Sequence, residues 1–447
     1  MWAAQAALPE TTSTWRSASI THGSTPKVFF NLKRNHLTVS LPRRGREFLE
    51  RSLLLKERRS FRLRAILIAI AATFFGTIAL LFLLGWLIIG PQGLTLLEGL
   101  AMIDLRFVGD YDRNTVLDSA MNGMIAGTGD RWSYYLNATA YEAQKLRRNN
   151  EYVGIGVMVS YEREEGLLIT AVNAGGPAEK AGLRPGEIIT AVDGTSLAGE
   201  ARHGGSDLVR GEEGTQISLT LLEEDGSTRT AAVVRKAIEE DPVSWTLLPD
   251  GIGYIQVENF YLRSAEQVKE AAETLQSQGA TALLFDMRNN GGGYLNELTA
   301  MLDTLLPEGP IFRSQSRTGN EQVVQSDSAC IPLPMATLVN QDTYSAAELF
   351  AAELQEKIGA PIVGVPTSGK GYSQQTYPLF SGGAVSISTH KYFTGEGVSL
   401  IGTGLTLDRE VPLSDQEAAA LWAGTLPYDQ DPQLQAALEL LHNSSDA

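Results

Sequence analysis

Ser345 is a residue whose surroundings in the sequence could support chemistry. It follows a short apolar stretch at residues 336–339 and a turn-forming run at residues 340–343, and it precedes an alanine-rich helical pattern. A serine at the start of a helix lies beside backbone N–H groups that lack intrahelical partners and could stabilise an oxyanion. The same position also suits a helix cap, with Glu348 closing a capping box. Ser345 is therefore a candidate nucleophile or a candidate cap.

Lys370 is the candidate base for such a nucleophile. It lies between Gly369 and Gly371, after a β-branched apolar stretch at residues 360–365. A serine hydroxyl needs a base, and lysine can replace histidine in that role. The lysine pKa would have to fall from about 10.4 to about 7–8, a change of roughly 4 kcal/mol that requires desolvation or nearby positive charge. Gln374 could hold the amine through its side-chain oxygen, whereas a surface lysine on a hairpin is the structural alternative.

Three motifs in the same order and at comparable separations resemble those of the carboxy-terminal processing peptidases. S-A-A-E at residues 345–348 is followed by Lys370, 25 positions after the serine, and then by Gln374. L-L-F-D-M-R-N-N-G-G-G-Y at residues 283–294 resembles the D-L-R-N-N-P-G-G of that family, and G-T-G-L-T-L-D at residues 402–408 resembles its G-X-G-X-X-P-D. The resemblance extends from about residue 117 to residue 441. It implies a serine peptidase of the tail-specific family S41, with a crotonase/ClpP-like α/β core and no cofactor.

The same resemblance implies a role for each candidate site residue. Ser345 would attack the substrate carbonyl, Lys370 would take the serine proton, and Gln374 would orient the lysine. The backbone amides of Gly292 and Ala346 would form the oxyanion hole.

The sequence departs from the family pattern at two places in this site. Gly291 stands where the family has proline, which affects the expected rigidity of the glycine-rich loop. A second glutamine, Gln375, precedes Thr376 where the family has a single one. Because Gln374 keeps the family spacing from the lysine, it is the predicted orienting residue and Gln375 is the alternative.

Residues 151–238 carry the alternating patterns of a small β-rich domain. Within them, G-P-A-E-K-A-G-L-R-P-G-E-I-I at residues 176–189 resembles a PDZ domain. Such domains bind a carboxyl-terminal peptide as an added strand and hold its carboxylate on backbone amides. The resemblance places that carboxylate-binding loop at Gly154, Ile155, Gly156 and Val157, although the same glycines would also suit a β-bulge. It predicts protein or peptide partners with free, apolar C-termini.

The regions around the β-rich domain have distinct patterns. Residues 91–150 are predicted to be helical, and G-D-R-W-S-Y-Y-L at residues 129–136 resembles a family motif that has proline in place of Arg131. The resemblance implies that this region supports the core and helps to form a homo-oligomer, whereas a helical spacer is the alternative. Residues 239–412 form the predicted α/β peptidase core, and residues 413–447 a helical segment packing on the core, followed by a short tail.

The beginning of the chain has the features of a membrane anchor. Residues 1–64 hold 13 lysines and arginines against 4 aspartates and glutamates, and residues 1–42 have no sustained periodicity, so residues 1–64 are predicted to be a basic, largely disordered segment. Residues 65–90 carry no charge, and 26 such residues can span a bilayer. The basic flank predicts a cytoplasmic N-terminus and a single-pass protein with its PDZ and catalytic domains outside the cytoplasm. A cleaved signal peptide, and hence a secreted soluble protease, is the alternative.

Charge and composition exclude several other classes of function. The net charge is −16, and the part after residue 64 holds 23 basic against 48 acidic residues, which argues against a nucleic-acid partner. The sequence has no H-E-x-x-H motif and no Cys/His cluster, so no metal site is predicted, and the lone Cys330 excludes an intrachain disulfide. His390 could in principle replace Lys370 as the base. A catalytically silent, membrane-tethered PDZ scaffold is the alternative from another class.

Overall fold

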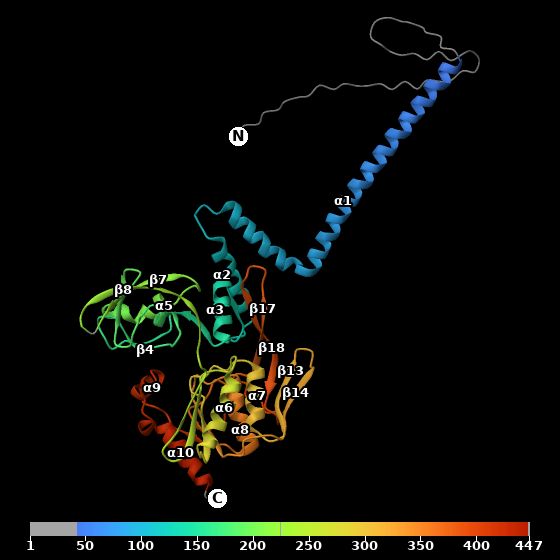
Figure 1. The fold of residues 1–447 in the computed structure, drawn as a ribbon. Coiled ribbons are helices and arrows are strands. Elements are labelled where there is room, and N and C mark those ends of the chain that lie inside the picture. The colour runs from blue at the N-terminus through green and yellow to red at the C-terminus, as the bar shows by residue number, and fades with distance from the viewer. Residues whose placement is uncertain (1–42, 224, 446–447) are drawn as a thin grey trace, which may run out of the picture. The chain divides into compact units, whose positions relative to one another are not determined.

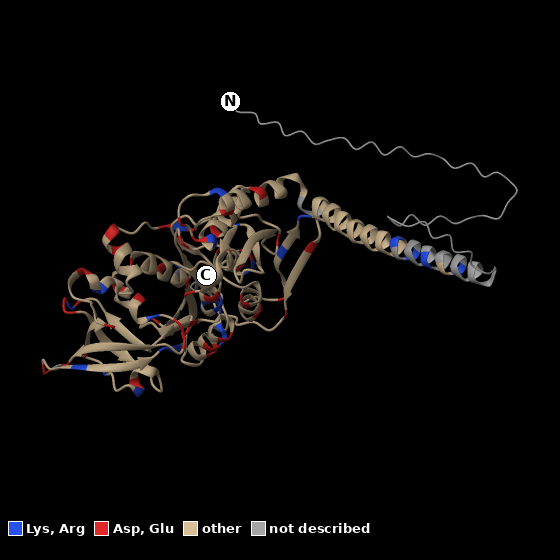
Figure 2. Ribbon diagram, turned by 90° about the horizontal axis from the view of Figure 1, so that it is seen from above, with Lys and Arg blue, Asp and Glu red and all other residues tan. Residues whose placement is uncertain are grey.

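The computed structural model describes residues 43–223 and 225–445 (Figure 1), so the prediction for residues 1–42 lies outside the described residues. The chain divides at Asp110 into two units. The first contains α1 (Arg43–Arg106), which is kinked at Gly90 (φ 67°) and Pro91. Most of its basic residues precede the apolar stretch, as Figure 2 shows, and the helix begins before that stretch; Arg106, in the last turn, follows it. Residues 64–87 are long and apolar enough to cross a membrane, with a mean hydropathy of 2.6.

The second unit begins with α2 (Arg113–Ala126), β1 (Tyr134–Leu136) and α3 (Ala138–Arg148). The side chain of Asp112 accepts hydrogen bonds from the amides of the first turn of α2. The prediction of an all-helical region is wrong at β1, which pairs antiparallel with β18 (Ala384–Phe393). A turn in which Asp130 accepts bonds from Trp132 N and Ser133 Oγ precedes β1, so the chain leaves the helical path there.

The β-rich domain follows, and its strands are paired as the alternation of the sequence predicts. β2 (Glu151–Gly154) pairs with β9 (Lys236–Glu239), and these two strands join the domain to the rest of the chain. The remaining strands form one sheet that encloses an apolar core with α4 (Pro177–Lys180), η1 (Gly199–Gly204) and α5 (Gly205–Val209). They are β3 (Val157–Ser160), β4 (Leu167–Val172), β5 (Ile188–Val192), β6 (Thr195–Ser196), β7 (Gln216–Leu222) and β8 (Thr228–Val234).

A six-stranded sheet forms the centre of the α/β core, in the order β10-β11-β12-β15-β16-β19. All its pairs are parallel except β10 with β11. The strands that lie inside it are almost wholly buried, as expected for a parallel sheet that is covered on both faces. The strand bounds are β10 (Val243–Leu247), β11 (Ile252–Val257), β12 (Ala282–Asp286), β15 (Met335–Val339), β16 (Ile362–Gly364) and β19 (Arg409–Glu410).

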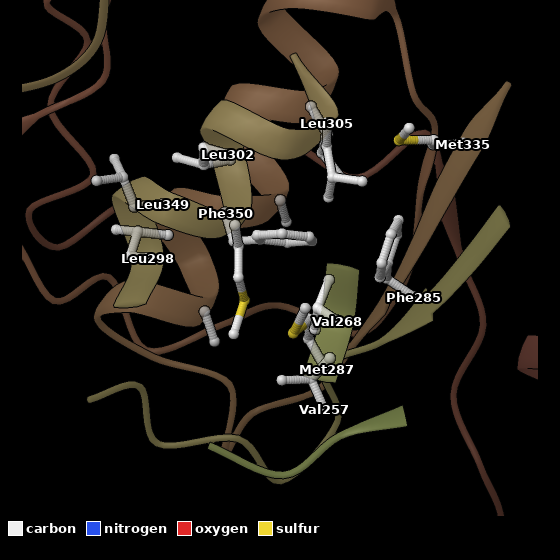
Figure 3. Close-up of a cluster of buried hydrophobic side chains, with 14 of the residues drawn as sticks. Val257, Val268, Phe285, Met287, Leu298, Leu302, Leu305, Met335, Leu349 and Phe350 are labelled. Carbon is white, nitrogen blue, oxygen red and sulfur yellow. The ribbon is translucent and has the colours of Figure 1, made fainter. Parts of the chain in front are cut away.

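Helices cover both faces of this sheet. α6 (Ser264–Ser277), α7 (Leu295–Leu305) and α8 (Ala346–Ile358) bury their apolar sides against one face, where Figure 3 shows Phe350 in the middle of the cluster and Phe285 on its sheet side. α10 (Pro432–Ser445) packs on the other face, as predicted for the C-terminal segment. It follows α9 (Asp415–Trp422) and η2 (Tyr428–Gln430).

A second sheet completes the core and has the order β1-β18-β13-β14, with β17 (Tyr372–Pro378) also paired to β18. β13 (Gly309–Ser316) and β14 (Glu321–Ser326) form a hairpin on its other side. Since β17 carries Gln374 and β1 follows Trp132, this sheet brings two distant parts of the sequence together.

Candidate active site

Ser345 lies at the junction of the loop after β15 with α8 and has an unusual backbone. Its φ is 63° and its ψ is −122°, a conformation that non-glycine residues rarely adopt and that is concentrated at functional sites. Gly292 (φ 82°) approaches it so closely that an added Cβ would lie 2.9 Å from Ser345 Cβ. Ser345 lines a cavity of about 770 Å³. The serine is thus held at the surface of a cleft, against a glycine that no larger residue could replace.

Glu348 connects the serine turn to the loop that carries Lys370. Its buried carboxylate accepts hydrogen bonds from the amides of Ser345 (3.1 Å), Gly369 (2.7 Å) and Lys370 (3.0 Å), and from Thr367 Oγ1 (2.6 Å). Burial raises the pKa of Glu348, while these four hydrogen bonds oppose the rise. The predicted capping role therefore covers only part of what this side chain does.

Lys370 is buried, with 9% of its surface exposed, and it lines the same cavity as Ser345. Its Nζ lies 4.9 Å from the ring centroid of Trp132 and 5.6 Å from that of Tyr344. Burial lowers the pKa of Lys370 to about 8, although the carboxylates of Glu348 and Asp130 oppose this. The alternative of a surface hairpin lysine is wrong, because the loop folds into the cleft.

Gln374 and Gln375 both line the cavity, next to each other on β17. The side-chain amide of Gln374 donates to the carbonyl of Tyr372 and to Ser388 Oγ, each at 2.9 Å. The Oε1 of Gln375 accepts a bond from the hydroxyl of Tyr377 (2.6 Å). Neither glutamine forms a hydrogen bond with Lys370 in the part of the chain that the structure describes, so the orienting role of Gln374 stays a prediction.

The proposed oxyanion donors lie side by side. An added Cβ on Gly292 would be 2.8 Å from the amide nitrogen of Ala346, which begins α8. The amide of Gly292 itself donates to Asn290 Oδ1 at 2.8 Å. That amide would have to exchange this partner for a substrate oxygen, so its role as an oxyanion donor also stays a prediction.

The predicted carboxylate-binding loop lines a second cavity, of about 320 Å³, in the β-rich domain. Gly156 has a φ of 78°, and its carbonyl accepts from the amide of Asn173, while the carbonyl of Ile155 accepts from the amide of Ala178. Gly154 and Val157 also line this cavity, together with Tyr152 and Arg210. The four residues therefore lie together at a hollow of the β-rich domain.

With the geometry established, comparisons with known proteins identify the family. The model of peptidase family S41 matches residues 251–411, and a PDZ domain model matches residues 168–223. The carboxyl-terminal-processing protease of Synechocystis is 30% identical over 330 residues, which cover 72% of this chain and 76% of that protein. The chain belongs to the S41 carboxy-terminal processing proteases.

A further relative and a solved structure are also similar to this S41 protease. The carboxy-terminal processing protease CtpA of Bacillus subtilis is 29% identical over 288 residues, 64% of this chain and 62% of that protein, so the chain spans less than two thirds of that relative's length. An S41 protease structure from Bacteroides fragilis is 18% identical and has a TM-score of 0.50 over 76% of this chain and 93% of that one. It supports the fold alone. The PDZ match begins after residues 154–157, so their carboxylate-binding role stays a prediction.

The structure of this S41 protease also places residues in the cleft that the sequence analysis did not assign to it. Trp132 and Arg148 come from the segment before the PDZ domain, and Tyr344 precedes the serine. The only sequence signal was the motif at residues 129–136, which the resemblance linked to support of the core. His390 forms a hydrogen bond with Thr389 Oγ1 (2.9 Å) and none with Ser345 among the described residues. No group of His, Cys, Asp and Glu that could hold a metal occurs among those residues either.

Proposed function

We propose that this S41 protease is a serine endopeptidase in which Ser345 is the nucleophile and Lys370 the base. The observation that carries the proposal is that one cavity contains both a strained serine at a helix N-terminus and a buried lysine whose pKa is lowered to about 8. At pH 7, about a tenth of such a lysine is neutral and can accept a proton. A buried structural lysine would instead be paired with a carboxylate.

The catalytic cycle follows from these positions. Neutral Lys370 takes the Ser345 proton while Oγ attacks the substrate carbonyl, and a tetrahedral intermediate forms. The amides of Gly292 and Ala346 stabilise its oxyanion, with the Gly292 amide leaving Asn290 to do so. The protonated lysine then donates to the departing amine, and the C–N bond breaks. Water, activated by the again neutral lysine, hydrolyses the acyl-enzyme and restores the serine.

Gln374 completes the catalytic group in this proposal. It lines the cavity on β17, and its side-chain oxygen is the group that can accept a hydrogen bond from the lysine amine. Ser388 and the carbonyl of Tyr372 hold its nitrogen, which leaves that oxygen oriented away from them.

The PDZ domain would select the substrates. A polypeptide with a free apolar C-terminus would add a strand in the groove at Gly154–Val157, and its carboxylate would bind to the backbone amides there. The peptide would then enter the cleft for cleavage upstream of its end.

A single membrane anchor completes the proposal, with the PDZ and catalytic domains outside the cytoplasm. It is supported by the 24-residue apolar stretch Arg64–Leu87, of which nothing is buried, and by the basic residues before it. The lone Cys330 is partly exposed and allows a direct test of this orientation.

The test of catalysis is fluorophosphonate labelling of the full-length chain in detergent, together with hydrolysis of an unstructured protein that has an apolar C-terminus. We expect wild type to be labelled and active, and Ser345→Ala and Lys370→Ala to lose both properties, by at least about 10³-fold in rate. Lys357→Ala is the matched control, since that lysine pairs with Glu396 away from the cleft. Absence of labelling and hydrolysis in wild type would favour the silent PDZ scaffold.

The test of orientation uses a membrane-impermeant maleimide on intact cells. We expect Cys330 to be labelled, and the double variant Cys330→Ser/Arg51→Cys to be labelled only after lysis, because residue 51 lies in the basic part of α1. The opposite pattern would reverse the proposed orientation, and a mature N-terminus near Pro91 would indicate a cleaved signal.

A further inference from the structure

The walls of the cleft beside Ser345 have a composition unlike that of the whole chain. The chain has a net charge of −16, yet no aspartate or glutamate among the residues that the structure describes lines this cavity. Its lining contains cationic residues, six of the fourteen tyrosines of the chain and one tryptophan: Arg131, Arg148, Lys370, Tyr134, Tyr141, Tyr261, Tyr294, Tyr344, Tyr377 and Trp132. This acidic protein thus has a cationic, tyrosine-rich cleft.

Two arginines provide the fixed positive charge of the cleft. The guanidinium of Arg131 lies 4.2 Å from the ring centroid of Trp132, and that of Arg148 lies 5.7 Å from the ring centroid of Tyr294. Arg148 Nη1 also lies 3.5 Å from Thr376 Oγ1. Neither arginine has a carboxylate within 4.0 Å in the described part of the chain, whereas Arg288 in the same core is paired with two. These ring contacts orient both guanidiniums and, apart from the Arg148 donor that faces Thr376, leave their donors for a ligand.

The ligand group that best matches such walls is a carboxylate. Guanidinium groups bind carboxylates with charge-assisted hydrogen bonds, and tyrosine hydroxyls can donate further ones. We propose that this cleft prefers polypeptides with an aspartate or glutamate side chain close to the scissile bond. The inference rests on the proposed function, because it assigns a specificity to the site where cleavage would occur. It adds to the PDZ groove, which would bind the terminal carboxylate elsewhere.

The position of Arg148 gives this preference a second signature. Its charge is one of the causes that lower the pKa of Lys370. A substrate carboxylate that pairs with Arg148 would neutralise this field, so the lysine would hold its proton more tightly in the complex. We therefore expect the midpoint of the kcat–pH profile to lie higher with an acidic peptide than with its neutral counterpart.

The experiment compares matched peptides on the full-length chain in detergent. A neutral parent peptide with an apolar C-terminus is compared with versions in which asparagine or glutamine within three positions of the cleavage point becomes aspartate or glutamate. Each is made with a free and with an amidated C-terminus. We expect the best acidic version to have a kcat/KM about tenfold higher, equivalent to about 1.4 kcal/mol, and the preference to weaken as salt screens the charges.

Substitutions of the two arginines test whether these residues cause the preference for acidic peptides. Arg131→Gln and Arg148→Gln should reduce the ratio of acidic to neutral kcat/KM to about a third or less, and Arg131→Glu should favour peptides with lysine at the same position. Arg147→Gln is the matched control, since Arg147 is an exposed neighbour on α3 that does not line the cavity, and it should keep the wild-type ratio.

The outcomes separate this inference from the proposed function. Cleavage of acidic and neutral peptides at equal rates would overturn the acidic preference and leave the peptidase intact. A preference that depends only on the free terminal carboxylate, and vanishes on amidation, would also overturn it. Cleavage of no peptide, with no fluorophosphonate labelling, would instead reject the proposed function.

Discussion

Two buried cations in the peptidase core, Arg288 and Lys370, are similarly buried but have pKa values shifted in opposite directions. Arg288 follows β12 at the start of the glycine-rich loop, and Lys370 follows β16 at the cleft. They are 5% and 9% exposed. Burial alone would lower the pKa of both, since it penalises the charged form. What differs is the set of partners around each group.

Arg288 is surrounded by compensating groups. Its guanidinium lies 2.5 Å from a carboxylate oxygen of Asp286 and 2.8 Å from one of Asp431, and it donates to Gln433 Oε1 at 3.0 Å. The carboxylates outweigh the effect of burial and raise the pKa of Arg288. Because Asp431 also accepts from the first amides of α10, the network ties the C-terminal helix to the glycine-rich loop.

Lys370 has no carboxylate within ion-pair distance among the described residues, and two aromatic rings take the place of such a partner. Its amine is thus desolvated without a paired carboxylate, and burial lowers its pKa to about 8, although the more distant charges of Glu348 and Asp130 oppose this shift. The comparison teaches that a buried cation with full pairing keeps its charge, whereas a buried cation without a paired carboxylate has a lowered pKa, which is the condition that the proposed role of Lys370 as a base requires.

The largest effect, on the free energy of unfolding, should come from breaking the ion pairs around Arg288. Asp286→Ala leaves the guanidinium of Arg288 with one carboxylate fewer and removes the partner of the Tyr254 hydroxyl (2.7 Å). We expect a loss of about 3–5 kcal/mol in the free energy of unfolding, measured by urea denaturation. Glu439→Ala, which removes the exposed partner of Arg409, should cost under about 1 kcal/mol. Equal losses in both variants would contradict the comparison.

A smaller effect should come from Glu353, a buried carboxylate on α8 that forms no ion pair among the described residues. Burial raises its pKa to about 7, although the amide of Gly395 donates to it. The folded state therefore binds the Glu353 proton more tightly than the unfolded state. This contribution to stability is complete below about pH 4.5 and is lost as pH rises through about 7.

Glu353→Gln should remove this dependence on pH, because the amide stays neutral. At pH 8 the variant should be about 2 kcal/mol more stable than wild type, and the difference should shrink toward pH 5. Thermal unfolding at both pH values measures it, with Glu270→Gln, an exposed position on α6, as the control. A variant less stable than wild type at pH 8 would show that the carboxylate is held in its charged form.

The smallest effect, on the pH profile of the reaction, should come from exposing the amine of Lys370 to water. Trp132→Ala removes a ring 4.9 Å from Lys370 Nζ, so water should reach the amine. The loss of the cation–π contact opposes the resulting rise in the lysine pKa, but burial is the largest cause of the present shift. We expect the midpoint of the kcat/KM–pH profile to move from about 8 to about 9 and the rate at pH 7 to fall about tenfold.

Trp132→Phe is the matched variant, since it keeps an aromatic ring at this place and should keep the midpoint near the wild-type value. A midpoint that does not move in Trp132→Ala would mean that the tryptophan does not control the solvation of the lysine.

The fold was largely predictable from local sequence. Alternation in residues 151–238 predicted the strands of the PDZ domain, and apolar strands alternating with helices predicted the α/β core around Ser345. These features follow from hydrophobic periodicity, which is a property of residues close together in the sequence. The helical assignment failed at β1, because its partner strand, β18, lies some 250 residues later in the chain.

The sequence by itself determined the residues available for the chemistry: a serine before a helix, a lysine between glycines and a glycine-rich loop between strand and helix. Only the tertiary structure decided the state of each group. Trp132 and Tyr344 desolvate Lys370, Glu348 ties the lysine loop to the serine turn, and the cleft is lined by arginines that pair with no carboxylate in the described ranges. Desolvation and charge pairing depend on side chains from distant segments, and the order of residues along a chain does not specify which of these will meet.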